Sequence, residues 1–316
     1  MSVGGAGGGS GGGGSASAPS RAARATHPLL APNPGLRRRK LVNGAMEGTA
    51  TLAALIAVAV LALVILSVLV KGISAINLDF FVKGPAPFGQ SGGGIANSIV
   101  GTALLVAMAS VLAVPIGILV GIHTSEFARP SVAASIRFAL DILNGVPTIV
   151  TGIFVFGLLV VGHVQSGYAG AFALAIIMLP IVARSAHEVL SLVPSSLREA
   201  SLALGVRRWR TVLTIVVPTA ASGLVTGALL GVARVAGETA PLLFTSSIAS
   251  NLVSTDPSQA LASIPVSIFT LSEEASPAAH AQAWAAALLL IFLVVVLNVI
   301  ARTLFGRSRA RLGATR

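Results

Sequence analysis

The chain has 316 residues, of which 54% are hydrophobic and 10% are charged, and it contains no cysteine. Its mean hydropathy of +0.91 is far above that of a water-soluble domain, and the lack of cysteine excludes disulfides and thiolate chemistry. The net charge of +11 is divided among segments separated by long apolar runs, which argues against one nucleic-acid-binding surface. The composition therefore predicts an integral membrane protein.

Residues 1–48 differ in composition from the rest of the chain. They contain a Gly/Ser tract at 4–17 and a basic run at 37–40. A segment with so little apolar surface does not offset the entropy lost on ordering, so we expect a disordered cytoplasmic tail. The first apolar run, 49–70, begins too far from the N-terminus for a cleaved secretory signal, so we expect a retained first helix.

Six apolar runs of about 15 to 27 residues follow one another along the chain. A helix needs about 20 residues to cross a hydrocarbon core of about 30 Å. Because backbone groups in lipid must pair locally, and no period-2 alternation is present, these runs are expected to be helices. The expected spans are 49–70, 96–122, 146–162, 168–182, 219–243 and 284–300. The predicted fold class is an all-α integral membrane protein with six transmembrane helices.

Lysine and arginine are distributed unequally between alternate loops. Six lie before the first span, two at 123–145, five at 183–218 and five at 301–316. The remaining loops hold only Lys71 and Lys83. Basic loops remain in the cytoplasm, so both termini are predicted to be cytoplasmic, including a basic tail at 304–316. The segment 244–283, which lacks Lys and Arg, is then outside, and its role stays open.

A polar segment at 198–210 interrupts the apolar pattern. Ser196 and Glu199 have the spacing of a capping box, which predicts a helix start near Leu197. Gly205 then follows at the position where a helix commonly ends in a left-handed residue. The pattern predicts a short helix that ends at this glycine.

A second short helix is expected at 207–213, leading to Pro218 at the entrance of the fifth span. The two helices would carry an exposed Trp209 and a basic flank. The residues alone leave two interpretations of this loop, a solvated connection or a docking surface.

The same loop resembles the cytoplasmic signature of ABC-transporter importer permeases. That signature is Glu-Ala-Ala, three residues, Gly, nine residues, Ile, one residue and Leu-Pro. The matching residues are Glu199, Ala200, Gly205, Ile215 and Pro218, with Ser201 and Val217 as conservative departures.

The resemblance implies the architecture of a type I (MetI-like) importer permease at 93–303, with a coupling loop at 184–217. It also implies that this loop docks onto a separate ATPase subunit. The residues implied in docking are Glu199, Ala200, Gly205, Arg207, Arg208 and Trp209.

The fifth span carries a narrow stripe of small and charged residues. Its members are Gly223, Gly227, Gly231, Arg234 and Glu238. Glycines at intervals of four indicate close approach of another helix, so the stripe is expected to face the bundle interior. A charge within a membrane costs about 2.5–3.5 kcal/mol, so the two charges are candidates for function. Two readings remain open, a self-neutralising structural pair or a transient partner for a crossing anion.

Three segments, 93–102, 144–150 and 237–241, resemble phosphate-uptake permeases, in particular the A-type permease subunits of phosphate-specific transporters. The resemblance implies an importer of inorganic phosphate in a bacterial plasma membrane, with Arg234, Glu238 and Thr239 lining the pathway. It implies a sister permease, ATPase subunits and an extracytoplasmic phosphate-binding protein as partners. Sulfate or molybdate remains an alternative substrate.

Several chemistries have no matching motif. None of the three lysines lies in a phosphate-binding loop, so we expect ATP hydrolysis by a partner chain and no cofactor on this one. The run from His187 ends in Ser191 where a zinc helix needs a second histidine, so no metal is expected. A channel or an intramembrane hydrolase is the rival class, without a supporting constellation. Arg137 and Asp141 are expected to form an i, i+4 ion pair or a second ATPase contact.

Overall fold

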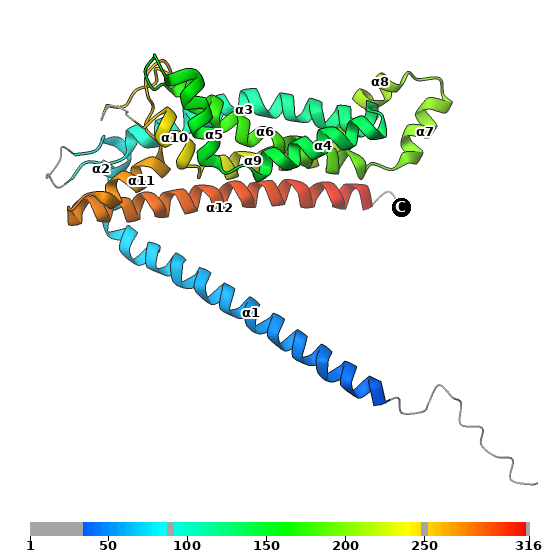
Figure 1. Cartoon of the computed structure of the whole chain (residues 1–316), viewed down its shortest axis with the longest axis horizontal. Helices are drawn as coiled ribbons and strands as arrows, with labels where there is room; N and C mark the ends of the chain where they lie inside the picture. The colour runs from blue at the N-terminus through cyan, green and yellow to red at the C-terminus, as the bar shows by residue number, and fades with distance from the viewer. Residues whose placement is uncertain (1–33, 87–91, 248–251, 314–316) are drawn as a thin grey trace, which may run out of the picture. The chain divides into compact units, whose positions relative to one another are not determined.

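A computed structural model describes residues 34–86, 92–247 and 252–313 (Figure 1). The chain divides into two units, 1–62 and 63–316, and each is described by itself. The described part of the first unit is the N-terminal portion of α1 (Pro34–Gly72), which belongs to a candidate span at Arg38–Ala75. Residues 34–48 are therefore helical, which corrects the expected disordered tail over that range. Residues 1–33 lie outside the described part.

The second unit contains the end of α1 and all later elements. Its first half comprises η2 (Ile73–Ala75), α2 (Leu78–Val82), α3 (Ala96–Ile122), η3 (His123–Phe127), α4 (Pro130–Gly145), α5 (Thr148–Val155), η4 (Phe156–Val160) and α6 (Gly167–Ser191). Its second half comprises α7 (Ser195–Ala203), α8 (Arg208–Thr211), η5 (Val212–Val216), α9 (Val217–Val235), α10 (Ala240–Thr245), α11 (Ile264–Glu273) and α12 (Pro277–Gly313). Within the described residues there is no strand, which confirms the all-α class.

Five of the described helices are long and apolar enough to cross a membrane, or six if the bent pair α4 and α5 counts as one span. The bounds of α3 coincide with the expected run 96–122. The last helix extends beyond the expected span, to Gly313, so residues 304–313 continue a helix instead of forming a separate tail.

The third expected span, 146–162, differs most from the sequence prediction. Residues 130–145, which were expected to be a loop, form the amphipathic helix α4. The chain then bends by 93° at Val146 and Pro147 before α5 begins. Proline lacks an amide hydrogen and restricts the residue before it, so a helix seldom continues through this point. The apolar part Thr148–Val160 rises only about 20 Å, too short to cross about 30 Å alone.

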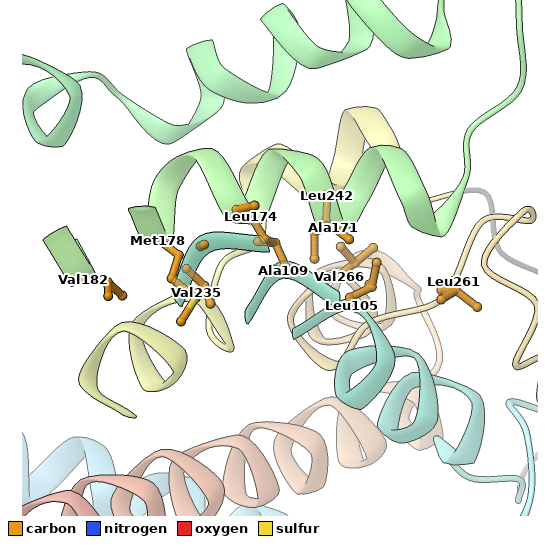
Figure 2. Close-up of a cluster of buried hydrophobic side chains, with 12 residues drawn as sticks. Leu105, Ala109, Ala171, Leu174, Met178, Val182, Val235, Leu242, Leu261 and Val266 are labelled. Carbon is orange, nitrogen blue, oxygen red and sulfur yellow. The ribbon is translucent and has the colours of Figure 1, made fainter. Parts of the chain in front are cut away.

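The core of the second unit lies between α3 and α6. Leu105 and Ala109 of α3 meet Leu174 and Met178 of α6, and all four are fully buried (Figure 2). Small residues allow this close approach. A Cβ added to Gly121 would lie 2.4 Å from the Cβ of Ala186, so a larger residue there forces the helices apart.

The fifth expected span, 219–243, is interrupted. α9 ends at Val235, the chain turns, and α10 begins at Ala240. Pro241 lies in the first turn of α10, where its missing amide hydrogen costs no hydrogen bond. Glu238 therefore lies in the break after α9 and not on the helix itself.

The segment expected outside the membrane folds back onto the helix bundle. Ser246 donates to the carbonyl of Leu261 at 2.9 Å and accepts from its amide at 2.8 Å. The amide of Ile264 donates to the Thr102 hydroxyl at 2.8 Å. The first two bonds close the segment on itself, and the third joins it to the N-terminal part of α3. In its exposed part, hydrogen bonds from Ser258 lower the pKa of Asp256, so this carboxylate is charged at neutral pH.

Candidate functional site

The loop between α6 and α9 forms two short helices at one end of the second unit (Figure 1). α7 begins at Ser195 with Pro194 as its N-cap residue, and no side chain caps it. The expected capping box at Ser196 is therefore wrong. Gly205 has a φ of +77°, the left-handed conformation expected for a terminating glycine. The hydroxyls of Ser201 and Thr211 lie 2.9 Å apart and join the two helices.

The residues implied in docking lie on the surface of these two helices. Glu199, Ala200, Gly205, Arg207, Arg208 and Trp209 are all exposed. Leu204, which had not been singled out, is 84% exposed, and Trp209 is 53% exposed. The loop therefore exposes both apolar and basic side chains, the kinds of residue that anchor protein interfaces.

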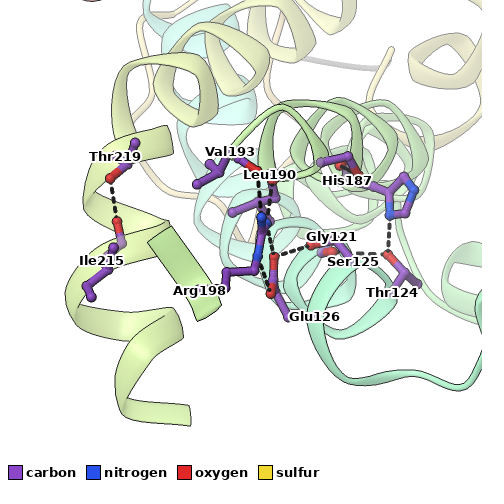
Figure 3. Close-up of polar contacts among 11 residues, drawn as sticks. Gly121, Thr124, Ser125, Glu126, His187, Leu190, Val193, Arg198, Ile215 and Thr219 are labelled. Atoms are coloured by element: carbon purple, nitrogen blue, oxygen red, sulfur yellow. Dashed lines mark hydrogen bonds and ion pairs between the residues drawn. The ribbon is translucent and has the colours of Figure 1, made fainter. Parts of the chain in front are cut away.

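Arg198 joins this loop to two long helices (Figure 3). Its Nη2 donates to Oε1 of Glu126 at 2.6 Å, and its Nε donates to Oε2 at 3.1 Å. It also donates to the carbonyls of Leu190 at 2.9 Å and Val193 at 2.5 Å, at the end of α6. The Glu126 side chain is only 4% exposed. A two-pronged, buried arginine–carboxylate pair is among the stronger polar contacts in proteins.

Sequence reasoning missed this contact. Glu126 lies 72 positions before Arg198, in the π-helical turn η3 that follows α3. α8 also reaches η3, because the Arg208 guanidinium lies 5.7 Å from the centre of the Phe127 ring. An acidic residue at the end of an apolar run was the available signal, but only the fold supplies its partner.

The loop is continuous with the helix that carries Arg234. α8, η5 and α9 join into one helical segment, Arg208–Val235, of 28 residues. The Thr219 hydroxyl donates to the carbonyl of Ile215 at 2.6 Å across the join (Figure 3). At about 1.5 Å per residue, the exposed loop and Arg234 are connected by roughly 40 Å of helix.

The three glycines of α9 contact α6. A Cβ added to Gly223 would lie 2.4 Å from Val189, and one added to Gly227 would lie 2.1 Å from the Ser185 hydroxyl. At Gly231 the nearest atom, in Val182, would lie 3.0 Å away. Side chains at these positions would separate α9 from α6, because interior packing leaves no spare space.

Arg234 and Glu238 form an ion pair at the end of α9. The two partners differ in environment, since the Glu238 side chain is 7% exposed and the Arg234 side chain is 57% exposed. The carboxylate is therefore held inside the fold, while the guanidinium reaches its surface. Thr239 follows as the N-cap residue of α10 and is half-buried.

A second group of charges lies between α4 and α6 and lines a cavity of about 540 Å³. Asp141 pairs with Arg184, not with Arg137 as expected from the i, i+4 spacing. Arg137 instead lies 3.3 Å from Nε2 of His187, whose Nδ1 lies 3.1 Å from the Thr124 hydroxyl. His187 is therefore a hydrogen-bonded residue of helix α6, which extends beyond the expected span 168–182 into the segment expected to be a loop.

Residues 113–312 match the family described as binding-protein-dependent transport system inner membrane component. The phosphate transport system permease protein PstA of Yersinia pestis is 43% identical over 250 residues, which cover 78% of this chain and 84% of the relative. PstA 1 of Mycobacterium tuberculosis (strain H37Rv) is 40% identical over 226 residues, covering 70% and 73% respectively.

A chain of the inward-facing MetNI methionine ABC transporter superposes with a TM-score of 0.51 at 17% identity, covering 69% of this chain and 94% of that chain. At this identity the likeness concerns the fold alone. The matches to sequence relatives confirm the resemblance to importer permeases. The chain therefore belongs to the family of binding-protein-dependent transport system inner membrane components and is a multi-pass membrane permease.

Proposed function

We propose that this chain is the permease subunit of an ATP-driven importer of inorganic phosphate in a bacterial plasma membrane, with both termini in the cytoplasm. Relatives named as phosphate permeases, at 37% to 43% identity over most of the chain, support the substrate. The observation that carries the proposal is the continuous helix Arg208–Val235, which joins an exposed loop to an exposed arginine.

The loop helices α7 and α8 dock onto the ATPase subunit. Trp209 and Leu204 supply the apolar contact, and the arginines at 207 and 208 supply charge. The ATPase hydrolyses ATP, while this chain receives the resulting movement. Two ATPase subunits, a sister permease and an outer phosphate-binding protein complete the transporter.

Movement of α7 reaches the membrane helices by two routes. The Arg198–Glu126 pair pulls on the ends of α3 and α6, and the peptide chain itself pulls on α9. Removing one partner of a buried ion pair costs about 3–5 kcal/mol, so the Arg198–Glu126 pair stays intact when α7 moves as a rigid body. The two routes therefore move the three helices together.

At the other end of α9, the anion competes with Glu238 for Arg234. In the empty state the pair is neutral, which lowers the cost of a charge near lipid. An arriving oxyanion takes bidentate hydrogen bonds from the exposed side of the guanidinium. Because Glu238 can form its ion pair with Arg234 again, the anion is bound weakly enough to dissociate on the cytoplasmic side. Thr239 follows Glu238 in the chain and lines the pathway at the same place.

Phosphate uptake in a strain lacking the gene tests the substrate. Restoring the chain is expected to restore uptake of radiolabelled phosphate, and excess sulfate or molybdate is expected to leave that uptake unchanged. If sulfate inhibits phosphate uptake as strongly as unlabelled phosphate does, the chain belongs to an importer of oxyanions in general. A chain that restores sulfate uptake alone would contradict the proposal.

Replacing Gly205 tests the docking loop. In Gly205→Val a β-branched residue must adopt a left-handed φ, at a cost of about 1–3 kcal/mol, although the space around it is open. We expect about tenfold less ATPase subunit to co-purify with the permease. Gly205→Asn is the matched control, because asparagine tolerates this conformation. Equal recovery of ATPase with the valine and asparagine variants would remove the loop from the interface.

A further inference from the structure

A cavity of about 240 Å³ lies where α4 turns into α5. Its polar lining consists of Asn144, Thr148, Thr151 and Arg234. Isoleucines 176, 177 and 181 of α6 form its apolar wall. A cavity of this size has room for a tetrahedral oxyanion together with a few waters, each of which occupies about 30 Å³ in the liquid.

The N-terminus of α5 begins at this cavity. Pro147 is its N-cap residue, and its carbonyl accepts from the amides of Val150 at 2.9 Å and Thr151 at 3.4 Å. The amides of Thr148 and Ile149, at the start of the helix, have no acceptor among the described backbone groups. Unpaired amides and the helix dipole make the start of a helix favourable for an anion. The 93° bend separates this N-terminus from α4, so its first turn is not covered by a continuing helix.

Thr151 provides an independent indication of a ligand. It is only 9% exposed and lines the cavity, yet its hydroxyl makes no hydrogen bond with any described residue. Other helical threonines donate to the carbonyl four residues earlier, such as Thr226 to Ser222 at 2.8 Å and Thr245 to Pro241 at 2.8 Å. Among the described side chains, every fully sealed polar atom has a partner. The Thr151 hydroxyl is therefore open to the cavity.

We propose that the N-terminus of α5, the hydroxyls of Thr148 and Thr151, and Arg234 form half of a binding site for the transported oxyanion. This inference rests on the proposed function and adds substrate contacts to it. The hydroxyls and amides donate to oxygens of the anion, and Arg234 supplies the opposite charge. The isoleucine wall lowers the local dielectric constant, which strengthens these contacts. The exposed guanidinium marks the side on which the sister permease completes the site.

Uptake kinetics of hydroxyl variants test these contacts. Thr151→Val keeps the side-chain shape but removes a hydrogen bond to a charged ligand, so KM for phosphate is expected to rise about tenfold. Thr151→Ser retains the donor and is expected to restore KM toward that of the original protein. An unchanged KM in the valine variant, with normal amounts of assembled transporter, would overturn the inference while the unsubstituted protein still imports phosphate.

Cysteine labelling gives a second measurement that does not depend on turnover. The chain has no cysteine, so Thr151→Cys introduces its only thiol. Phosphate is expected to slow modification of this thiol by an anionic methanethiosulfonate in the assembled transporter. Phe154 of α5 is 60% exposed and does not line the cavity, so Phe154→Cys is the control and is expected to react equally with and without phosphate. Equal rates at position 151 with and without phosphate would contradict the site.

Failure of the inference and failure of the proposed function give different results. If the unsubstituted chain imports no phosphate, the proposed function fails before any variant is compared. If it imports phosphate while Thr151→Val leaves KM unchanged, or while phosphate does not slow labelling of Thr151→Cys, only the half-site at α5 is wrong.

Discussion

Arg234→Gln is expected to abolish phosphate uptake, with a loss of at least about a hundredfold, because the anion loses a charged bidentate donor. Glutamine keeps much of the length and polarity but cannot neutralise an anion. The substitution also leaves Glu238, which is 7% exposed, without its counter-charge. Initial rates of radiolabelled phosphate uptake, normalised to the amount of assembled complex, measure the effect.

A double variant separates transport from stability. An unpaired buried carboxylate destabilises a protein by about 3–5 kcal/mol, so the single variant alone could lose activity through misassembly. Arg234→Gln combined with Glu238→Gln removes both charges and is expected to recover assembly without recovering uptake. Arg234→Lys keeps the charge but not the planar fork, and is expected to retain partial uptake. Uptake at the original rate in the double variant would show that the pair is structural only.

Glu126→Gln is expected to uncouple ATP hydrolysis from transport. The variant keeps the shape of the side chain but leaves Arg198 without its carboxylate, and removing one partner of a buried ion pair costs about 3–5 kcal/mol. Arg198 still donates hydrogen bonds to the carbonyls of Leu190 and Val193, so α7 stays attached to the end of α6. Its ion pair with the end of α3 is lost. We expect the phosphate transported per ATP hydrolysed in proteoliposomes to fall more than about tenfold.

The same substitution at an exposed pair provides the control. Glu188 pairs with Arg184 on the surface, where both side chains are more than half exposed. Such pairs contribute about 0–1 kcal/mol, so Glu188→Gln is expected to leave the transport ratio unchanged. If Glu126→Gln behaves like Glu188→Gln, the Arg198–Glu126 contact does not transmit movement. If Glu126→Gln lowers the amount of assembled complex but leaves the phosphate transported per ATP unchanged, the Arg198–Glu126 contact serves stability alone.

Features with a local cause were predictable from the residues. Continuous apolar runs predicted the long helices because lipid offers backbone groups no partner, and α3 has the expected bounds. Gly205 was expected to be left-handed because glycine lacks the Cβ that disfavours this conformation. The glycines of α9 were expected at a helix contact because their spacing repeats every turn, and they lie against α6.

Features that depend on a distant partner were not predictable. Asp141 was expected to pair with Arg137 on its own helix, yet Arg184 of α6 lies closer. Two local signals were also misjudged. The capping box at Ser196 is absent because α7 begins at Ser195, two residues before the expected start at Leu197. The bend at Val146 and Pro147 coincides with the start of the expected span 146–162, and hydropathy alone did not indicate that the more polar stretch before it is also helical.

The amino-acid pattern was sufficient to predict the membrane class, the helical fold, the two-helix loop and two candidate charged residues, Arg234 in α9 and Glu238 after it. These follow from hydropathy, backbone restrictions and spacing within one or two helical turns. Helix packing, which the pattern does not reveal, pairs Glu126 with Arg198, buries Glu238 while it leaves Arg234 exposed, and opens Thr151 into a cavity. Burial and pairing are properties of helices packed together, and residues many positions apart acquire them only when the chain folds.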